Sequence, residues 1–206
     1  MTTDEQVLDE LIGSPMEADC AIDESLRARL VADAERTGLL DVAYRTVESP
    51  LGPLLLAATP AGVVRVAFEG EGHDAVLAVL AERISPRILH APGRLDGPTR
   101  QLDEYFSGAR RAFDVAVDLS LAHGFRRKVL DHLRTIAYGT TESYTVVAQA
   151  SGSPAAVRAV GSACATNPVP LVVPCHRVVR TDGTIGQYRG GTEAKRTLLA
   201  LEAQNS

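Results

Sequence analysis

Apolar and polar positions follow two different periods along this chain. In the first half, short apolar runs bounded by turn residues predict β-strands over 42–48, 54–59 and 63–68. The turn Pro60-Ala61-Gly62 joins the last two runs as a hairpin. We therefore expect an antiparallel sheet in this part of the chain.

Helical segments follow these strands in the sequence. Segments 74–84 and 97–106 repeat their apolar residues at helical spacing, and 113–119 alternates as a further strand. Residues 41–120 are thus predicted to form a small α+β domain.

Residues 1–40 are predicted to be an acidic, helical N-terminal extension. In this segment Leu26, Leu30 and Ala34 share one face of a helix. We expect an amphipathic helix packed on the rest of the protein, preceded by a loosely ordered tail. It carries no visible chemistry.

From residue 121 the pattern becomes one of short helices, so residues 121–206 are predicted to form a mostly helical C-terminal domain. A helix near 125–136 is followed by one over 143–150. Ser153-Pro154 then supplies an N-cap and a first-turn proline for a third helix. The last two helices, joined through a glycine-containing turn, predict a helix-turn-helix.

Beyond that motif the chain is predicted to be extended and then helical again. The third helix is expected to end at Asn167-Pro168, and the apolar segment 169–174 leads as extended chain into Cys175. A glycine-rich loop over 183–191 precedes a final helix over 193–204.

Composition excludes several classes of protein. The chain has 206 residues with 45% hydrophobic and 23% charged residues, which is ordinary for a globular protein. There is no apolar run long enough to span a membrane and no signal-peptide pattern, so a cytoplasmic location is expected. Three cysteines without a CxxC pair, and five scattered histidines, predict neither disulfides nor a metal site.

Charge is distributed unevenly between the two halves. Residues 1–120 contain 11 Lys/Arg and 21 Asp/Glu, a balance of −10, whereas residues 121–206 contain 10 and 5, a balance of +5. Such asymmetry is typical of a chain with one binding half, although a chance distribution of surface charge explains it equally well.

Pro174-Cys175-His176-Arg177 is the strongest candidate for chemistry. Its apolar flanks predict a buried cysteine, and the neighbouring His176 and Arg177 are expected to hold a thiolate below its free pKa of about 8.5. Side chains alternate in an extended segment, so a bridging water is the natural proton path from sulfur to His176. The local pattern alone fits an inert buried cysteine equally well, and Cys164 is interpreted in that way.

The sequence around these four residues favours a functional cysteine at position 175. Arg158-Ala-Val-Gly-Ser-Ala-Cys-Ala-Thr-Asn-Pro-Val-Pro-Leu-Val-Val-Pro-Cys-His-Arg-Val-Val resembles the signature of the O6-alkylguanine-DNA alkyltransferase family. The resemblance is most specific over 143–202. It extends more weakly to Ser49-Pro-Leu-Gly-Pro-Leu-Leu-Leu and leaves out residues 1–40. It implies an α+β fold whose N-terminal domain is ribonuclease H-like.

The resemblance also implies roles for individual residues. Cys175 matches the alkyl acceptor, His176 the residue that takes its proton through a water, and Glu202 the carboxylate that orients the histidine. Tyr144 matches the hydroxyl that hydrogen-bonds a guanine ring nitrogen, and Asn167 matches the hinge behind the active-site segment. Substrate contacts are expected from Tyr144, Val178, Tyr188 and Arg189.

DNA contacts are expected on the predicted third helix. Arg158 matches the finger that enters the base stack after the damaged nucleotide leaves. The small residues around it, Ala155, Ala159 and Gly161, allow the close approach that a minor groove demands, although a tightly packed core helix has the same composition. Ser143 completes the expected DNA-binding set.

The implied reaction is DNA repair by stoichiometric, irreversible alkyl transfer from O6-alkylguanine to Cys175, with the damaged base flipped out. A thioether is a poor leaving group and offers water no carbonyl to attack, so each copy acts once and needs no cofactor. The expected partner is double-stranded DNA bound by a monomer, and O4-alkylthymine stays open as a second substrate.

Two other functions are compatible with parts of this pattern. A non-catalytic alkylguanine sensor on the same scaffold lacks the acceptor cysteine, which is present here. A Cys-His-Glu hydrolase would need direct nucleophile–base contact and an oxyanion hole, and leaves Arg158 unexplained. Stable transfer, binding without transfer, or repeated turnover of labelled substrate separates the three.

The chain departs from the family pattern in two places. Ala122-His-Gly-Phe-Arg-Arg-Lys-Val-Leu stands where many relatives have Gly-Thr-Phe-Gln and a following tryptophan, and the chain has no tryptophan. Arg189 replaces a small residue of the closing loop. The first departure affects expected packing and the second the expected pocket size.

Overall fold

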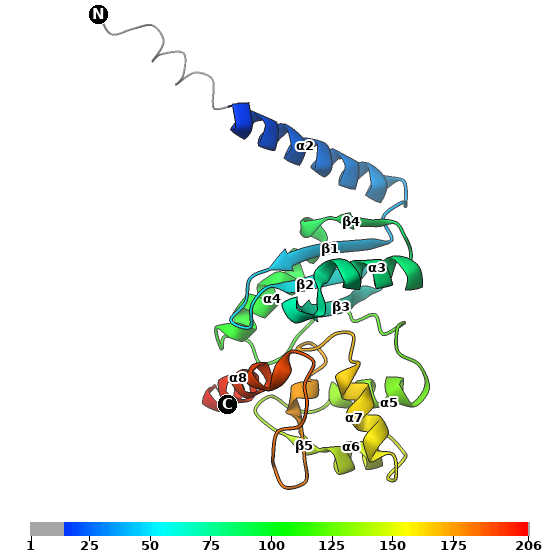
Figure 1. The fold of residues 1–206 in the computed structure, drawn as a ribbon, viewed down its shortest axis with the longest axis vertical. Helices are drawn as coiled ribbons and strands as arrows, with labels where there is room; N and C mark the ends of the chain where they lie inside the picture. The colour runs from blue at the N-terminus through cyan, green and yellow to red at the C-terminus, as the bar shows by residue number, and fades with distance from the viewer. Residues whose placement is uncertain (1–14, 206) are drawn as a thin grey trace, which may run out of the picture. The chain divides into compact units, whose positions relative to one another are not determined.

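The computed structural model describes residues 15–205, with side chains from Ser25 onward. The described residues divide into two compact units, with the boundary between Leu40 and Asp41. In the first unit, α2 (Pro15–Arg36) contains the predicted helix (Figure 1). Leu26 and Leu30 of this helix are exposed, and the expected packing of the helix on the rest of the protein stays a prediction. The predicted loose tail falls largely outside the described residues.

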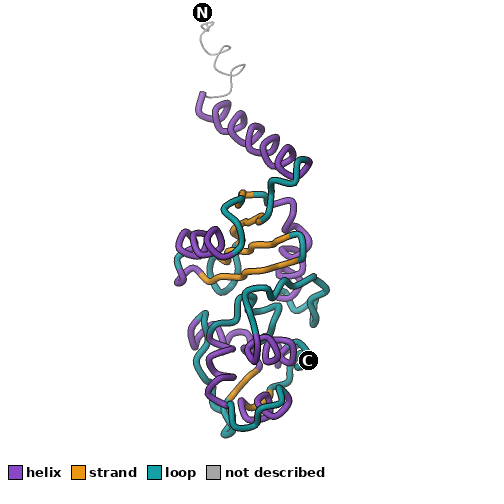
Figure 2. Tube along the Cα trace, turned by 90° about the vertical axis from the view of Figure 1, so that its right-hand side faces the viewer, coloured by secondary structure: helices purple, strands orange, loops and turns teal. Residues whose placement is uncertain are grey.

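The second unit begins with a four-stranded sheet in the order β3-β2-β1-β4 (Figures 1 and 2). Strands β1 and β2 and strands β2 and β3 pair antiparallel, which confirms the predicted hairpin, whereas β4 pairs parallel to β1. The three residues of β4 are too few to show an alternating pattern, and no strand was predicted there. The strands are β1 (Val42–Val47), β2 (Leu54–Thr59), β3 (Gly62–Phe68) and β4 (Ile88–His90).

The strand expected over 113–119 is not formed. This segment makes one isolated bridge, between Val63 and Val117, with hydrogen bonds from Val63 N to Ala116 O and from Asp118 N to Val63 O. Gly62 allows this approach, because a Cβ at its position would collide with the Ala116 backbone. The alternation of 113–119 therefore reflects packing along a sheet edge without a continuous ladder.

Alternating residues give the sheet two apolar faces, each covered by a helix. Leu55 and Ala57 share one cluster with Leu80 of α3, while Leu54 and Leu56 share another with Tyr105 of α4. The second cluster continues into the C-terminal helices. The elements are η1 (Glu69–Glu71), α3 (His73–Arg83), η2 (Pro92–Leu95) and α4 (Asp96–Phe106).

The C-terminal half is mostly helical, as predicted. It also contains a two-stranded parallel pair that joins residues 142–143 to residues 178–179. Ser143 caps α6 by accepting a hydrogen bond from Val146 N at 3.2 Å. Figures 1 and 2 show β3 as the strand beside this half, where Val66 N donates to Pro168 O. The elements are α5 (Gly124–Leu133), β5 (Glu142–Ser143), α6 (Tyr144–Ala150), α7 (Val157–Ala165), η3 (Cys175–Arg177), β6 (Val178–Val179) and α8 (Gly191–Gln204).

The start predicted for the third helix is wrong by three residues. Helix α7 begins at Val157, and Ser153 instead closes a turn by accepting a hydrogen bond from Ala156 N at 2.9 Å. The serine–proline pair thus ends the connection from α6 and does not open a helix. Ala155, expected on the helix, lies in this turn.

The segment before Cys175 is not extended. It turns at Leu171, which has a φ of 74°, and Val173 N donates to Val169 O at 2.9 Å. Cys175 then begins the 3-10 turn η3. The expected alternation of Cys175 and His176 across an extended strand is therefore wrong.

None of the helices in the described part of the chain combines the length and apolarity needed to cross a bilayer.

Candidate active site

Cys175 is buried, with 1% of its surface exposed. Asn167 Nδ2 lies 3.1 Å from Cys175 Sγ and also donates to Val173 O at 2.8 Å. Its Oδ1 accepts from Val169 N at 3.0 Å. The Asn167 side chain therefore braces the turn between α7 and η3, as expected of a hinge residue. The same side chain also supplies a hydrogen-bond donor to the Cys175 sulfur.

Burial raises the pKa of the Cys175 thiol to about 11, although the hydrogen bond from Asn167 and the charge of Lys195 act in the opposite direction. The expectation of a thiolate held below its free pKa is therefore wrong for the resting protein. Cys175 is a neutral thiol at pH 7 and has to lose its proton during any reaction.

His176 is placed to accept a proton. Its Nε2 lies 2.9 Å from Glu202 Oε1, and its Nδ1 is buried with no hydrogen-bond partner among the described residues. Burial would raise the pKa of Glu202, but hydrogen bonds from His176 and Arg177 hold it at about 2, so this carboxylate only accepts. His176 Nε2 must then carry the hydrogen, which leaves the Nδ1 lone pair free. Burial also lowers the pKa of His176, so the ring is neutral at rest.

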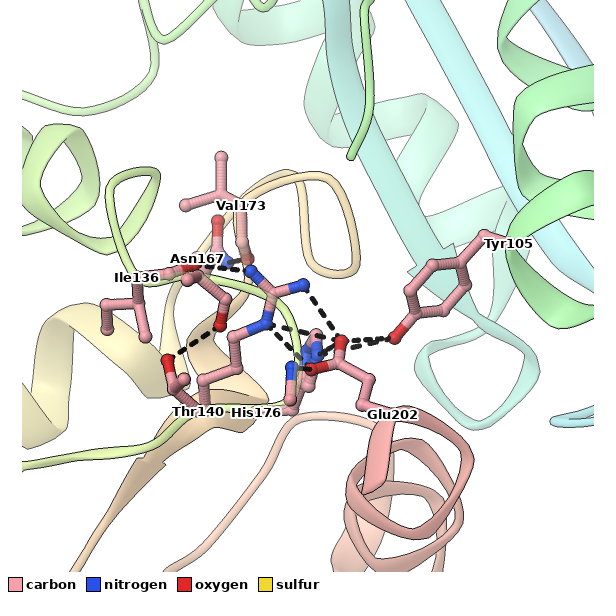
Figure 3. Close-up of polar contacts among 10 residues, drawn as sticks. Tyr105, Ile136, Thr140, Asn167, Val173, His176 and Glu202 are labelled. Carbon is pink, nitrogen blue, oxygen red and sulfur yellow. Dashed lines mark hydrogen bonds and ion pairs between the residues drawn. The ribbon is translucent and has the colours of Figure 1, made fainter. Parts of the chain in front are cut away.

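Glu202 is the centre of a buried polar network (Figure 3). Arg177 donates to it from Nε at 2.9 Å and from Nη2 at 2.9 Å, and Tyr105 donates its hydroxyl at 2.7 Å. Gly139 N adds a fourth donor at 3.1 Å. Arg177 was expected to act on the Cys175 thiol. It instead donates to Glu202 and orients that carboxylate.

Tyr105 was not among the site residues predicted from the sequence. It lies on α4 in the sheet half and reaches Glu202 on α8 across 97 positions of sequence (Figure 3). Its hydroxyl also lies 3.4 Å from His176 Nε2. Nothing in the local pattern around Tyr105 distinguishes it from a core aromatic residue.

Lys195 was also missed. It is fully buried, donates from Nζ to Val178 O at 2.5 Å, and lies 6.0 Å from the centre of the Tyr144 ring. Burial lowers the pKa of Lys195, and the nearby Cys175 acts against that shift. Lys195 and Glu202 are seven residues apart on one buried face of α8, and this spacing was the available signal.

The glycine-rich loop packs against the site. Tyr188 is buried, with its ring 5.6 Å from Phe68 and 6.3 Å from His176. Burial raises the pKa of the Tyr144 hydroxyl to about 12, so it stays protonated and can donate. Gly186 lies against that hydroxyl so closely that a Cβ would collide with it. The expected substrate residues Tyr144 and Tyr188 are both near enough to Cys175 for its charge to raise their pKa values.

Helix α7 has one buried and one exposed face. Val160, Ala163 and Cys164 are buried, whereas Arg158 and Ala159 are exposed. Ala155 is exposed in the preceding turn, and Gly161 is half-buried. This exposed surface of small residues with a single arginine lies directly before the Asn167 hinge.

Three further expected residues make contacts within the protein. Val178 is buried in β6, and its carbonyl oxygen accepts a hydrogen bond from Lys195 Nζ. Ser143 caps α6. Arg189 turns toward the sheet half and pairs with Glu71. Among the described residues, no group of three or more His, Cys, Asp or Glu side chains is arranged to hold a metal ion.

Comparisons with known proteins agree on one family. Residues 42–119 match the ribonuclease-like domain of 6-O-methylguanine DNA methyltransferase, and residues 124–204 match the DNA binding domain of the same enzyme. A methylated-DNA–protein-cysteine methyltransferase of Mycobacterium bovis is 41% identical over 165 residues, covering 77% of this chain and 91% of that protein. One of Methanosarcina barkeri is 35% identical, covering 79% and 98%. A crystal structure of Mycobacterium tuberculosis OGT in complex with DNA is similar with a TM-score of 0.69 and 37% identity, covering 80% and 94%.

Proposed function

Since this chain belongs to the 6-O-methylguanine DNA methyltransferase family, we propose that it repairs DNA by moving an alkyl group from guanine O6 to the sulfur of Cys175. The observation that carries the assignment is the buried pair of Cys175 with its Asn167 donor and His176 with a free Nδ1.

The first chemical step is removal of the thiol proton. Cys175 gives its proton through a water to Nδ1 of His176, and Glu202 stabilises the resulting imidazolium through Nε2. Because Glu202 is ionised and held by Arg177 and Tyr105, it fixes the imidazole tautomer before substrate arrives.

Transfer then exchanges one bond for another. The sulfur forms a bond to the alkyl carbon, the bond from that carbon to O6 breaks, and its electron pair stays on the guanine. A hydrogen bond from the Tyr144 hydroxyl to the base stabilises this developing negative charge, as a preorganised donor does in other active sites. Tyr188 covers the base from the glycine-rich loop.

DNA is engaged through α7. Its exposed surface around Arg158 and Ala159 enters the minor groove, where small side chains permit close approach. Unstacking the damaged base costs a few kcal/mol, and Arg158 offsets part of that cost by filling the gap. Ala155, Gly161 and Ser143 flank this contact.

The product is a thioether, and no described group can reverse it, so each copy acts once. We propose that the protein works as a monomer in the cytoplasm.

The experiment is intact mass measurement after incubation with a duplex containing one O6-methylguanine, followed by peptide mapping. We expect a gain of one methyl group on Cys175, saturating at one per protein. Cys175→Ala should bind the duplex and gain nothing, while the matched control Cys164→Ala should behave as the parent protein. Tight binding of the lesion without any mass gain would indicate a sensor, and repeated turnover would indicate a hydrolase.

A further inference from the structure

Four arginines from separate elements line a cavity of about 370 Å³ whose lining does not include Cys175. Arg65 lies on β3, Arg83 on α3, Arg126 on α5 and Arg189 in the glycine-rich loop. Arg126 and Arg189 belong to the two places where this chain departs from its family pattern. Both departures therefore meet at one cavity.

Negative charge is scarce around this arginine cavity. Glu71 is the one acidic residue in its lining, and it is shared: Arg65 pairs with it at 2.5 Å, and Arg189 pairs with the same oxygen. Glu71 Oε1 is also occupied by Phe68 N at 3.0 Å. One carboxylate therefore faces four guanidinium groups.

Arg126 has a buried side-chain nitrogen, Nε, without a hydrogen-bond partner among the described residues. One of its terminal nitrogens donates to Thr166 O. The pKa of Arg126 is lowered by burial and by the charges of Arg189 and Arg83. Arg65, whose side chain is 7% exposed, has its pKa lowered by burial and also by Arg189 and Arg126. An anion in the cavity would relieve both effects.

We propose that this arginine cavity binds one phosphate-class anion. Guanidinium groups match phosphate oxygens in geometry, and the oxygens of a tetrahedral phosphate can accept donors that converge from several elements. Binding there would also compete with Glu71 for Arg189, and so act on the loop that carries Tyr188.

The anion has two sources with the same chemistry: inorganic phosphate or a phosphate of the DNA backbone. Two arginine variants remove charge from the cavity at different elements, Arg126→Gln and Arg83→Gln. Arg127→Gln is the matched control, because Arg127 is the next residue of α5 and pairs with Asp131 at 3.0 Å outside the cavity. None of the three lies in the proposed alkyl-transfer site.

The first arm measures thermal unfolding and calorimetric binding with inorganic phosphate against chloride at equal ionic strength. We expect phosphate to bind and stabilise the parent protein and Arg127→Gln, and this effect to be lost in Arg126→Gln and Arg83→Gln. The second arm measures affinity for an unmodified duplex over a salt series. If the occupant is a DNA phosphate, both cavity variants lower the salt slope by about 1, and Arg127→Gln does not.

The site is supported if the cavity variants lose phosphate binding or lower the salt slope while Arg127→Gln does not. Which of the two signals changes shows whether the anion is inorganic phosphate or a DNA phosphate. The proposal is overturned if neither phosphate nor the salt slope distinguishes the cavity variants from Arg127→Gln. Because this outcome is independent of methyl transfer to Cys175, it is distinct from a failure of the repair function.

Discussion

The hydroxyl of Tyr105 allows a direct test of the network behind His176. Tyr105→Phe removes the hydroxyl that donates to Glu202 Oε1 at 2.7 Å and lies 3.4 Å from His176 Nε2, and it leaves the buried ring in place. A hydrogen bond to a charged group contributes about 1.5–3 kcal/mol, and Glu202 keeps its other donors. We therefore expect the free energy of unfolding to fall by about 2 kcal/mol, or a loss of roughly 4–8 °C in Tm for a domain of this size.

Tyr138→Phe is the matched control. The Tyr138 ring lies 6.0 Å from that of Tyr105, but its hydroxyl is buried and has no hydrogen-bond partner among the described residues. Removing an unsatisfied hydroxyl should change the stability by less than about 0.5 kcal/mol, or increase it.

Equilibrium unfolding in urea gives both values, provided that the slope of the transition is unchanged. Equal losses in the two variants would show that the Tyr105–Glu202 bond contributes nothing specific. No loss in Tyr105→Phe would refute the view that the sheet half positions Glu202.

Three further predictions concern the site. Glu202 has a folded pKa of about 2 against an ordinary 4.5, so its stabilisation, about 3 kcal/mol, is present above pH 4.5 and lost as the pH falls toward 2; acid titration of unfolding should show this loss in the parent and not in Glu202→Gln. Arg158→Ala should slow repair of duplex DNA by about 10- to 100-fold, equivalent to about 1.4–3 kcal/mol, and leave the reaction with free O6-benzylguanine nearly unchanged; equal losses on both substrates would place Arg158 in folding instead. Asn167→Ala leaves Val169 N and Val173 O without their partner, so urea unfolding should show a loss of about 3 kcal/mol, and single-turnover transfer at pH 7 should slow because the pKa of Cys175 rises further; an unchanged rate would argue against the sulfur contact.

Local signals in the sequence determined much of this architecture. The hairpin of β2 and β3 follows from alternating apolar runs around a glycine turn, and α3 and α4 follow from helical spacing, because each pattern reflects burial on one face of a single element. Resemblance over 143–202 supplied Cys175 and its neighbours as candidates for the site.

Interactions between distant segments decided the rest. The start of α7 depends on a turn that Ser153 closes, and 113–119 pairs at a single bridge because the β3 edge also receives Pro168. The expected thiolate is a neutral thiol, since burial outweighs the nearby donors. Neither the approach of Tyr105 to Glu202 nor the meeting of Arg126 and Arg189 at one cavity has any local signature, because each brings together residues more than 60 positions apart that are neighbours only in the folded protein.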